Sequence, residues 1–172
     1  MTEGAVLFAD LQMDALYDAL EEGVVTELIG SATAQLGEAV FACGGRVVKV
    51  IGAEVLAVFP DVPEAAEAAI AMQRHRAARP LEGPGVGALC IGIAWGPLTE
   101  RDGDVFGDTV SIAARLQSFA RASALPIVLS GESVARLRPG QPAARQVHAI
   151  DVKGRQIRIE LYALPWMRQD GR

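Results

Sequence analysis

Aromatic side chains are scarce in this sequence, and so is lysine. Phe, Trp and Tyr make up 5% of the 172 residues, so the core must consist mainly of Ala, Val, Leu and Ile. Only two of the 16 basic residues, Lys49 and Lys153, are lysines, which suggests roles that a guanidinium would not fill. The 21 acidic residues outnumber the basic ones and give a net charge of −5. A nonspecific nucleic-acid binder needs a basic surface, so that class is excluded.

Cysteines and long apolar runs are also few. Cys43 and Cys90 form no CxxC pair and lie near no histidine cluster, which argues against structural zinc and a thioredoxin-type site. We predict two buried free thiols in a reducing compartment. The N-terminal MTEG lacks the basic and apolar regions of a signal peptide, and the uncharged stretch 86–98 is too short to span a bilayer. We therefore expect a cytoplasmic protein without a membrane segment.

Hydrophobic residues, in contrast, are abundant. They make up 51% of the chain, which excludes intrinsic disorder. The length suits one domain, and no repeat or linker divides the sequence. We predict a single domain over residues 1–172, with a core at about 4–164 and a short tail at 165–172.

The hydrophobic pattern alternates between strand-like and helix-like segments. The first half predicts a buried strand, one kinked helix or two helices, a hairpin and an Ala-rich helix begun by a capping box, at residues 4–11, 16–43, 46–51 with 54–59, and 61–79. The second half predicts a central strand, a turn, a helix, a strand, a short helix and a terminal hairpin, at residues 88–95, 101–104, 107–122, 126–129, 132–137, and 146–152 with 157–164. This order indicates an α+β protein with helices packed on one mixed sheet.

Three segments carry polar residues where packing alone would not require them. Asp10 ends an apolar strand, where it could also simply cap the next helix. Lys49 lies inside a strand, and alternation places it on the face opposite to its two neighbours, where it could equally be a solvent-facing lysine. Ser111 and Arg115 are i,i+4 neighbours on one face of a predicted helix, and could form no more than an exposed polar stripe.

Taken together, these segments resemble the catalytic domain of the class III nucleotide cyclases, which include adenylyl and guanylyl cyclases. The resemblance covers almost the whole chain, in five blocks that follow the family's order. The blocks are FADL (8–11), GGRVVKVIGAEVLAVFP (44–60), IGIAWGP (91–97), DGDVFGDTVSIAARL (102–116) and VKGR with IELYAL (152–155 and 159–164). The resemblance implies a ferredoxin-like βαββαβ core with additional C-terminal α/β elements.

The resemblance also implies a role for each matching residue. Asp10 matches one of two metal-binding aspartates, and the metal of an active enzyme would be Mg²⁺ or Mn²⁺, with none bound tightly. Lys49 and Asp104 match the pair that reads the purine, and their chemistry suits adenine, because a carboxylate accepts from its exocyclic amine and an ammonium donates to a ring nitrogen. Arg115 matches the arginine that stabilises charge at the α-phosphate. Lys153, with Arg155 close by, matches the region that clamps the triphosphate.

Sites of this family form between two chains. The resemblance therefore implies a head-to-tail homodimer with two equivalent sites, or a heterodimer with an active cyclase. It assigns the metal aspartates and Lys49 to one chain, and Asp104 and Arg115 to the other.

One departure from the family's pattern affects the metal site. Ala53 stands where the family has its second metal aspartate, although two metal ions bridged by both aspartates normally clamp the triphosphate. Glu54 is adjacent, but alternation predicts that it points the other way and is a poor replacement.

Other departures are less direct. Ser111 replaces the asparagine that orients the ribose and would reach it only through water. Met13 and Asp14 replace small residues near the phosphates, where we expect them to add bulk and repulsion. Trp95 belongs to a pair that replaces polar residues on the central strand, where we expect it to reshape the interface.

Three functions remain compatible with this sequence. The first is a dimeric cyclase-homology domain that binds an ATP-type nucleotide and has weak or no cyclase activity, because several independent departures accumulate around the phosphates. The second is an active adenylyl cyclase, with Ala53 an engineered substitution or the site completed by a partner. The third is a signalling or scaffold module that binds a partner protein through the dimer face.

Overall fold

The structure is a computed structural model of the chain that describes residues 1–79, 87–152, 154 and 156–167. Alternating strand and helix patterns in the sequence become thirteen elements in this part of the chain. In order, they are β1 (Thr2–Leu11), α1 (Asp14–Ala19), α2 (Glu22–Ala42), β2 (Arg46–Ile51), β3 (Glu54–Phe59), α3 (Val62–Ala78), β4 (Leu89–Arg101), β5 (Asp104–Phe106), α4 (Asp108–Ala122), β6 (Ile127–Ser130), α5 (Gly131–Val134), β7 (Arg145–Val152) and β8 (Ile157–Ala163).

The strands form one eight-stranded sheet in the order β2-β3-β1-β4-β6-β8-β7, with β5 paired to β4. Its first four strands are joined antiparallel, β2 to β3, β3 to β1 and β1 to β4, as a ferredoxin-like βαββαβ core requires. The parallel β4–β6 pair and the antiparallel β8 and β7 extend this core at one edge. The prediction of an α+β fold with C-terminal additions is confirmed.

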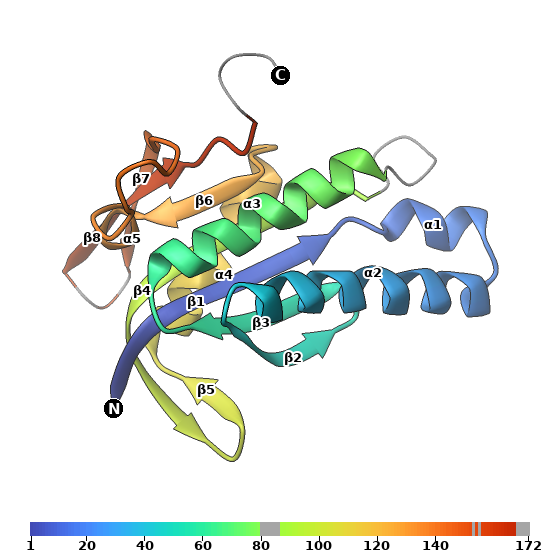
Figure 1. Cartoon of the computed structure of the whole chain (residues 1–172), viewed down its shortest axis with the longest axis horizontal. Helices are drawn as coiled ribbons and strands as arrows, with labels where there is room; N and C mark the ends of the chain where they lie inside the picture. The colour runs from blue at the N-terminus through green and yellow to red at the C-terminus, as the bar shows by residue number, and fades with distance from the viewer. Residues whose placement is uncertain (80–86, 153, 155, 168–172) are drawn as a thin grey trace.

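Helices cover the two faces of the sheet unequally. Figure 1 shows α2 and α3 across the near face, with α4 behind the sheet. Alternation along β1 sends Leu7 and Ala9 to the α2–α3 side and Val6 and Phe8 to the α4 side. Each face therefore has its own apolar cluster, and α4 is the long helix that covers the second one.

Two glycines of β4 allow α4 to lie close to the sheet. A Cβ on Gly92 would lie 2.4 Å from the backbone nitrogen of Gln117, and one on Gly96 would lie 2.6 Å from Oγ1 of Thr109. Real Cβ atoms do not approach other atoms this closely, so only glycine fits at either position. The close approach fixes the height of α4 above β1 and β4, and with it the position of every polar side chain on the helix.

Of the two alternatives predicted for the first helical region, the structure has two helices, divided at Leu20 and Glu21, with the three glycines inside α2. It differs from the predicted elements in two other places. Strand β4 continues to Arg101, where Asp102 and Gly103, both with positive φ, form the two-residue turn into β5. Helix α5 ends at Val134, earlier than predicted.

Candidate functional site

Lys49 reaches the α4 side of the sheet through a β-bulge. Lys49 pairs with Leu56 and Val47 pairs with Ala57, so the extra residue, Val48, interrupts the alternation of β2. Leu56 pairs in turn with Phe8 on β1, so Lys49 belongs to a cross-strand row on the α4 side. The prediction that simple alternation puts Lys49 and Val48 on opposite faces is wrong, because Val48 also packs against the α4-side cluster.

The ammonium of Lys49 forms an ion pair with Asp104 at the start of β5. Nζ donates to Oδ1 at 3.0 Å and to Oδ2 at 2.9 Å, and the backbone nitrogen of Val105 donates to Oδ1 at 2.8 Å. These bonds hold the pKa of the Asp104 carboxyl below its usual value, because the Lys49 ammonium donates to the charged form. The two side chains pair within one chain, which differs from the expectation that they come from opposite halves of the site.

A second ion pair fixes the β4–β5 hairpin against β2. Arg46 donates from Nη2 to Oε1 of Glu100 at 3.2 Å and from Nη1 to the carbonyl oxygen of Gly103 at 3.4 Å. The hairpin extends away from the rest of the sheet in Figure 1, and these exposed contacts join it to β2, the strand that carries Lys49.

The Lys49–Asp104 pair keeps hydrogen-bonding capacity for a ligand. Two of the three ammonium hydrogens of Lys49 suffice for the bonds to Asp104, which leaves one donor. The three bonds that Asp104 accepts from described residues leave about one of its roughly four lone-pair sites. The side chain of Lys49 is 43% exposed and that of Asp104 is 35% exposed, so a ligand can reach both groups.

Asp10 lies near the end of β1, as predicted, and its carboxylate is engaged by α4. Its Oδ2 accepts from Nε2 of Gln117 at 3.2 Å and from Nη1 of Arg121 at 3.0 Å. Arg121 also donates from Nη2 to Oδ2 of Asp14 at 2.6 Å, so its guanidinium bridges two carboxylates. Burial raises the pKa of Asp10 despite the opposing charge of Arg121.

Glu54 is the residue that faces Asp10 across the strands. Asp10 and Glu54 are register partners of the antiparallel β1–β3 pair, so their side chains share one face of the sheet. Burial and the charge of Asp10 both raise the pKa of Glu54. Ala53, in contrast, packs against the cluster on the α2–α3 side. The prediction that Glu54 points away from the site is therefore wrong.

The two candidate catalytic residues of α4 lie on its outer surface. Ser111 and Arg115 are both exposed, and neither side chain has a hydrogen-bond or ion-pair partner among the residues that the structure describes. Neither residue is bonded to the Lys49–Asp104 pair or to Asp10. Lys153 and Arg155 lie outside the described residues.

The expectations for Met13 and Asp14 need correction, and the structure also places Trp95. Met13 is 2% exposed and belongs to the cluster on the α2–α3 side, so it does not add bulk beside the phosphates. Asp14 is paired with Arg121, so its charge is partly compensated. Trp95 packs on the α2–α3 side of the sheet under the guanidinium of Arg136, 3.7 Å from its ring centre, where it does not line the α4 side.

Gln117 and Arg121 were not predicted from the sequence. They follow Arg115 on α4, and their i,i+4 spacing places both on one face of the helix, which was a usable signal. Nothing in the sequence indicated that this face would meet Asp10, because the contact spans more than a hundred residues.

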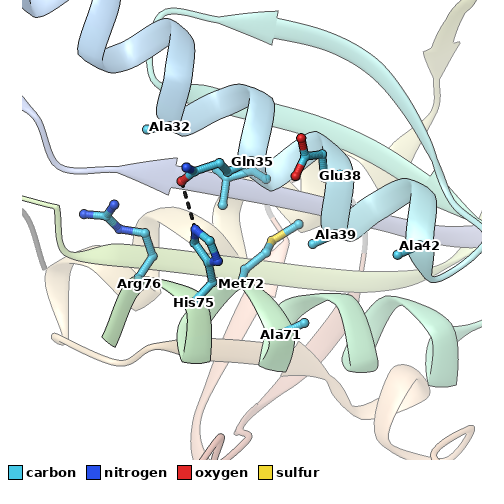
Figure 2. A pocket seen from close by; sticks show the side chains of 10 residues that line it. Ala32, Gln35, Glu38, Ala39, Ala42, Ala71, Met72, His75 and Arg76 are labelled. Atoms are coloured by element: carbon cyan, nitrogen blue, oxygen red, sulfur yellow. Dashed lines mark hydrogen bonds between the residues drawn. The ribbon is translucent and has the colours of Figure 1, made fainter. Parts of the chain in front are cut away.

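A hollow of about 260 Å³ lies on the other side of the molecule, between α2 and α3. Figure 2 shows Gln35 of α2 pointing toward His75 of α3, with its Oε1 3.0 Å from Nε2 of the ring. Alanines line much of the hollow, so it reflects small side chains at a helix crossing. No residue of the candidate site lines it.

Comparisons with known proteins agree with this arrangement. The chain is 39% identical over 125 residues to an adenylate cyclase of Streptomyces coelicolor, an alignment that covers 70% of this chain and 31% of that relative. It is 38% identical over 117 residues to an adenylate cyclase of Glutamicibacter nicotianae, covering 67% of this chain and 28% of that relative. The chain belongs to the class III nucleotide cyclase family. It spans about a third of the length of the curated relatives that it matches.

Solved structures agree on the class III cyclase fold. A crystal structure of an adenylate/guanylate cyclase/hydrolase from Silicibacter pomeroyi is 26% identical, has a TM-score of 0.75, and matches 95% of this chain and 97% of its own. A bacterial light-regulated adenylyl cyclase has a TM-score of 0.80 at 20% identity, over 96% of this chain and 52% of its own. No protein-family model matches the sequence. In the described part of this class III cyclase homologue, no helix is both long and apolar enough to cross a membrane.

Proposed function

We propose that this class III cyclase homologue binds a purine nucleoside triphosphate of the ATP type and catalyses its cyclisation weakly or not at all. One observation supports the proposal above others. The Lys49–Asp104 pair is accessible and offers a donor and an acceptor side by side, whereas Asp10 is mostly buried and paired with the Arg121 cation. The site is therefore suited to recognition at one end and poorly suited to metal chemistry at the other.

The free positions of the Lys49–Asp104 pair match adenine better than guanine. A ring nitrogen of adenine accepts from the remaining Lys49 donor, and its exocyclic amine donates to the remaining site on Asp104. Guanine has a carbonyl oxygen where adenine has this amine, and that oxygen would face a carboxylate. We therefore expect ATP to bind in preference to GTP.

Nucleotide binding is tested by calorimetric titration of the whole chain with ATP and with GTP. Lys49→Ala should weaken ATP binding by at least about tenfold, which corresponds to about 1.4 kcal/mol. Arg138→Ala is the control, since it removes an arginine that pairs with Glu64 and is bonded to neither Lys49 nor Asp104. The proposal fails if the unaltered chain binds neither nucleotide, or if both variants lose ATP equally.

Cyclase activity is tested by measuring cAMP formed from ATP with Mg²⁺ and with Mn²⁺. We expect no product at ordinary enzyme rates, because Ala53 offers no oxygen to a metal and the Arg121 cation lies beside Asp10. Ala53→Asp should restore little activity, since Arg121 would still hold Asp10. Ordinary rates in the unaltered chain would overturn the catalytic half of the proposal and leave the binding half standing.

The second candidate is an active adenylyl cyclase whose site is completed between chains. Ser111 and Arg115 favour it, because both are exposed and have no side-chain partner in the described part of the chain, as groups that serve a nucleotide on another subunit would be. The partner would be a second copy in a head-to-tail dimer or an active cyclase. This candidate predicts that Ala53→Asp raises turnover by orders of magnitude. A scaffold role without nucleotide predicts no effect of ATP on the melting temperature.

A further inference from the structure

Arg121 lies beside Asp10, where the resemblance to the class III cyclases implies a metal ion. Its two terminal nitrogens donate to different carboxylates, Nη1 to Asp10 at 3.0 Å and Nη2 to Asp14 at 2.6 Å. Gln117 donates to the same oxygen of Asp10 at 3.2 Å. The guanidinium thus links the end of β1, the start of α1 and the last turn of α4.

The packing of α4 supports this arrangement, in which the Arg121 side chain itself is 44% exposed. Gln117 is 6% exposed and lies one helical turn before Arg121, on the same face of α4. The helix lies close enough to donate to Asp10 because Gly92 on β4 has no side chain. A cation in the last turn of a helix is also stabilised by the helix dipole. The contact between Arg121 and Asp10 therefore depends on the packing of α4 as well as on the attraction between the two charges.

The residues present do not fit the family's metal ions. A pair of bridged ions needs two carboxylates that are both free, and position 53 is an alanine. No group of three or more His, Cys, Asp or Glu side chains in the described ranges is arranged to hold an ion. An ion at Asp10 would also lie next to the Arg121 guanidinium and be repelled by it.

The carboxylate of Glu54 also favours a positive charge beside Asp10. It faces Asp10 across the strands, so two carboxylates share a half-buried place that burial makes unfavourable for charge. Arg121 is the only cation that an ion pair joins to Asp10 among the described residues. A fixed positive charge is needed here whether or not a ligand is bound.

We propose that Arg121 is a built-in cation that replaces a divalent metal beside Asp10. Mg²⁺ and Mn²⁺ are excluded from this position by a side chain of the same protein. The proposal concerns the metal alone and holds whether or not the chain binds a nucleotide.

The experiment is a titration of the whole chain with Mn²⁺ in the absence of nucleotide, followed by the electron paramagnetic resonance signal of free Mn²⁺. The unaltered chain and Ala53→Asp should bind Mn²⁺ no better than millimolar. Arg121→Ala should bind it at least about tenfold more tightly, and Arg121→Ala combined with Ala53→Asp more tightly again, since each change frees or adds a carboxylate. Arg138→Ala is the matched control, because it removes an arginine that pairs with another carboxylate, Glu64, and it should not gain Mn²⁺ binding.

Several results would overturn the proposal. They are tight Mn²⁺ binding by the unaltered chain, no gain in Arg121→Ala, or an equal gain in Arg138→Ala. If tight binding by the unaltered chain disappeared in Glu54→Gln, Glu54 would be the replacement ligand instead. Arg121→Gln keeps a hydrogen-bond donor beside Asp10 without its charge, and it serves if Arg121→Ala does not fold, with the same expected gain.

Discussion

The two ends of the candidate site both rest on an ion pair, but the pairs differ in what they leave available. At the recognition end, Lys49 and Asp104 are 43% and 35% exposed and keep one donor and one acceptor for a ligand. At the metal end, Asp10 is 15% exposed and two side chains of α4 share one of its oxygens. A ligand can thus reach the ion pair at one end, whereas at the other end a cation of the protein lies beside a mostly buried carboxylate.

The largest expected effect removes the packing on which the metal end depends. Gly92→Val puts a branched side chain into the backbone of α4, and we expect the free energy of unfolding to fall by about 3 kcal/mol or more. Urea denaturation measures the loss. Gly30→Ala is the control, since a Cβ there meets nothing within 4 Å, and it should stabilise the chain by up to about 1 kcal/mol. A Gly92→Val chain as stable as the unaltered one would show that α4 does not need the close approach.

A smaller effect separates the two ion pairs by their contribution to stability. Arg121→Ala leaves the mostly buried Asp10 with Gln117 as its remaining donor, and should cost about 1–2 kcal/mol at pH 7. Lys49→Ala should cost clearly less, because its pair is exposed and screened by solvent. Urea titrations of both variants give the order, and a larger loss for Lys49→Ala would reverse the comparison.

The next effect depends on pH and concerns Glu54. Its pKa is raised in the folded chain, by burial first and by Asp10 second, so its contribution is fully present below the ordinary carboxyl range and is lost as the pH rises through the folded-state pKa. Glu54→Gln removes this loss. It should melt a few degrees higher than the unaltered chain at pH 7 and at the same temperature below about pH 4.

Thermal melts at several pH values test this. Glu27→Gln, on the exposed surface of α2, is the control and should show no such dependence. An equal gain for Glu54→Gln at every pH would mean that ionisation of Glu54 is not the cause.

The smallest expected effect on stability is that of Asp104→Asn. The Asp104 pKa is lowered, mainly by the bond from Lys49, so the unaltered chain loses this contribution as the pH falls through the folded-state pKa. Because the pair is exposed, we expect the melting temperatures at pH 7 to be the same within error, while the preference for ATP over GTP falls. A marked loss of stability with unchanged preference would make the pair structural.

Much of the fold could be predicted from local patterns. The apolar run of β1, the hairpin spacing of β2 and β3, and the N-cap residue Asp61 of α3 are signals contained in a few neighbouring residues. The side of the sheet on which a residue lies was harder to predict. The bulge in β2 changed the face on which Lys49 lies, and the register of β1 with β3 decided the face of Glu54. A shift of one residue reverses the face, and no local pattern fixes it.

The sequence by itself determined the order of the elements, the positions of Lys49, Asp104 and Arg115 in family-like blocks, and the loss of an oxygen ligand at Ala53. These depend on residue types and on spacing along the chain. Only the tertiary structure decided that Lys49 and Asp104 meet within one chain, that Glu54 faces Asp10, and that Arg121 takes the remaining carboxylate. Such contacts join residues that are 44 to 111 positions apart, so they depend on how the sheet is ordered and how closely α4 packs on it.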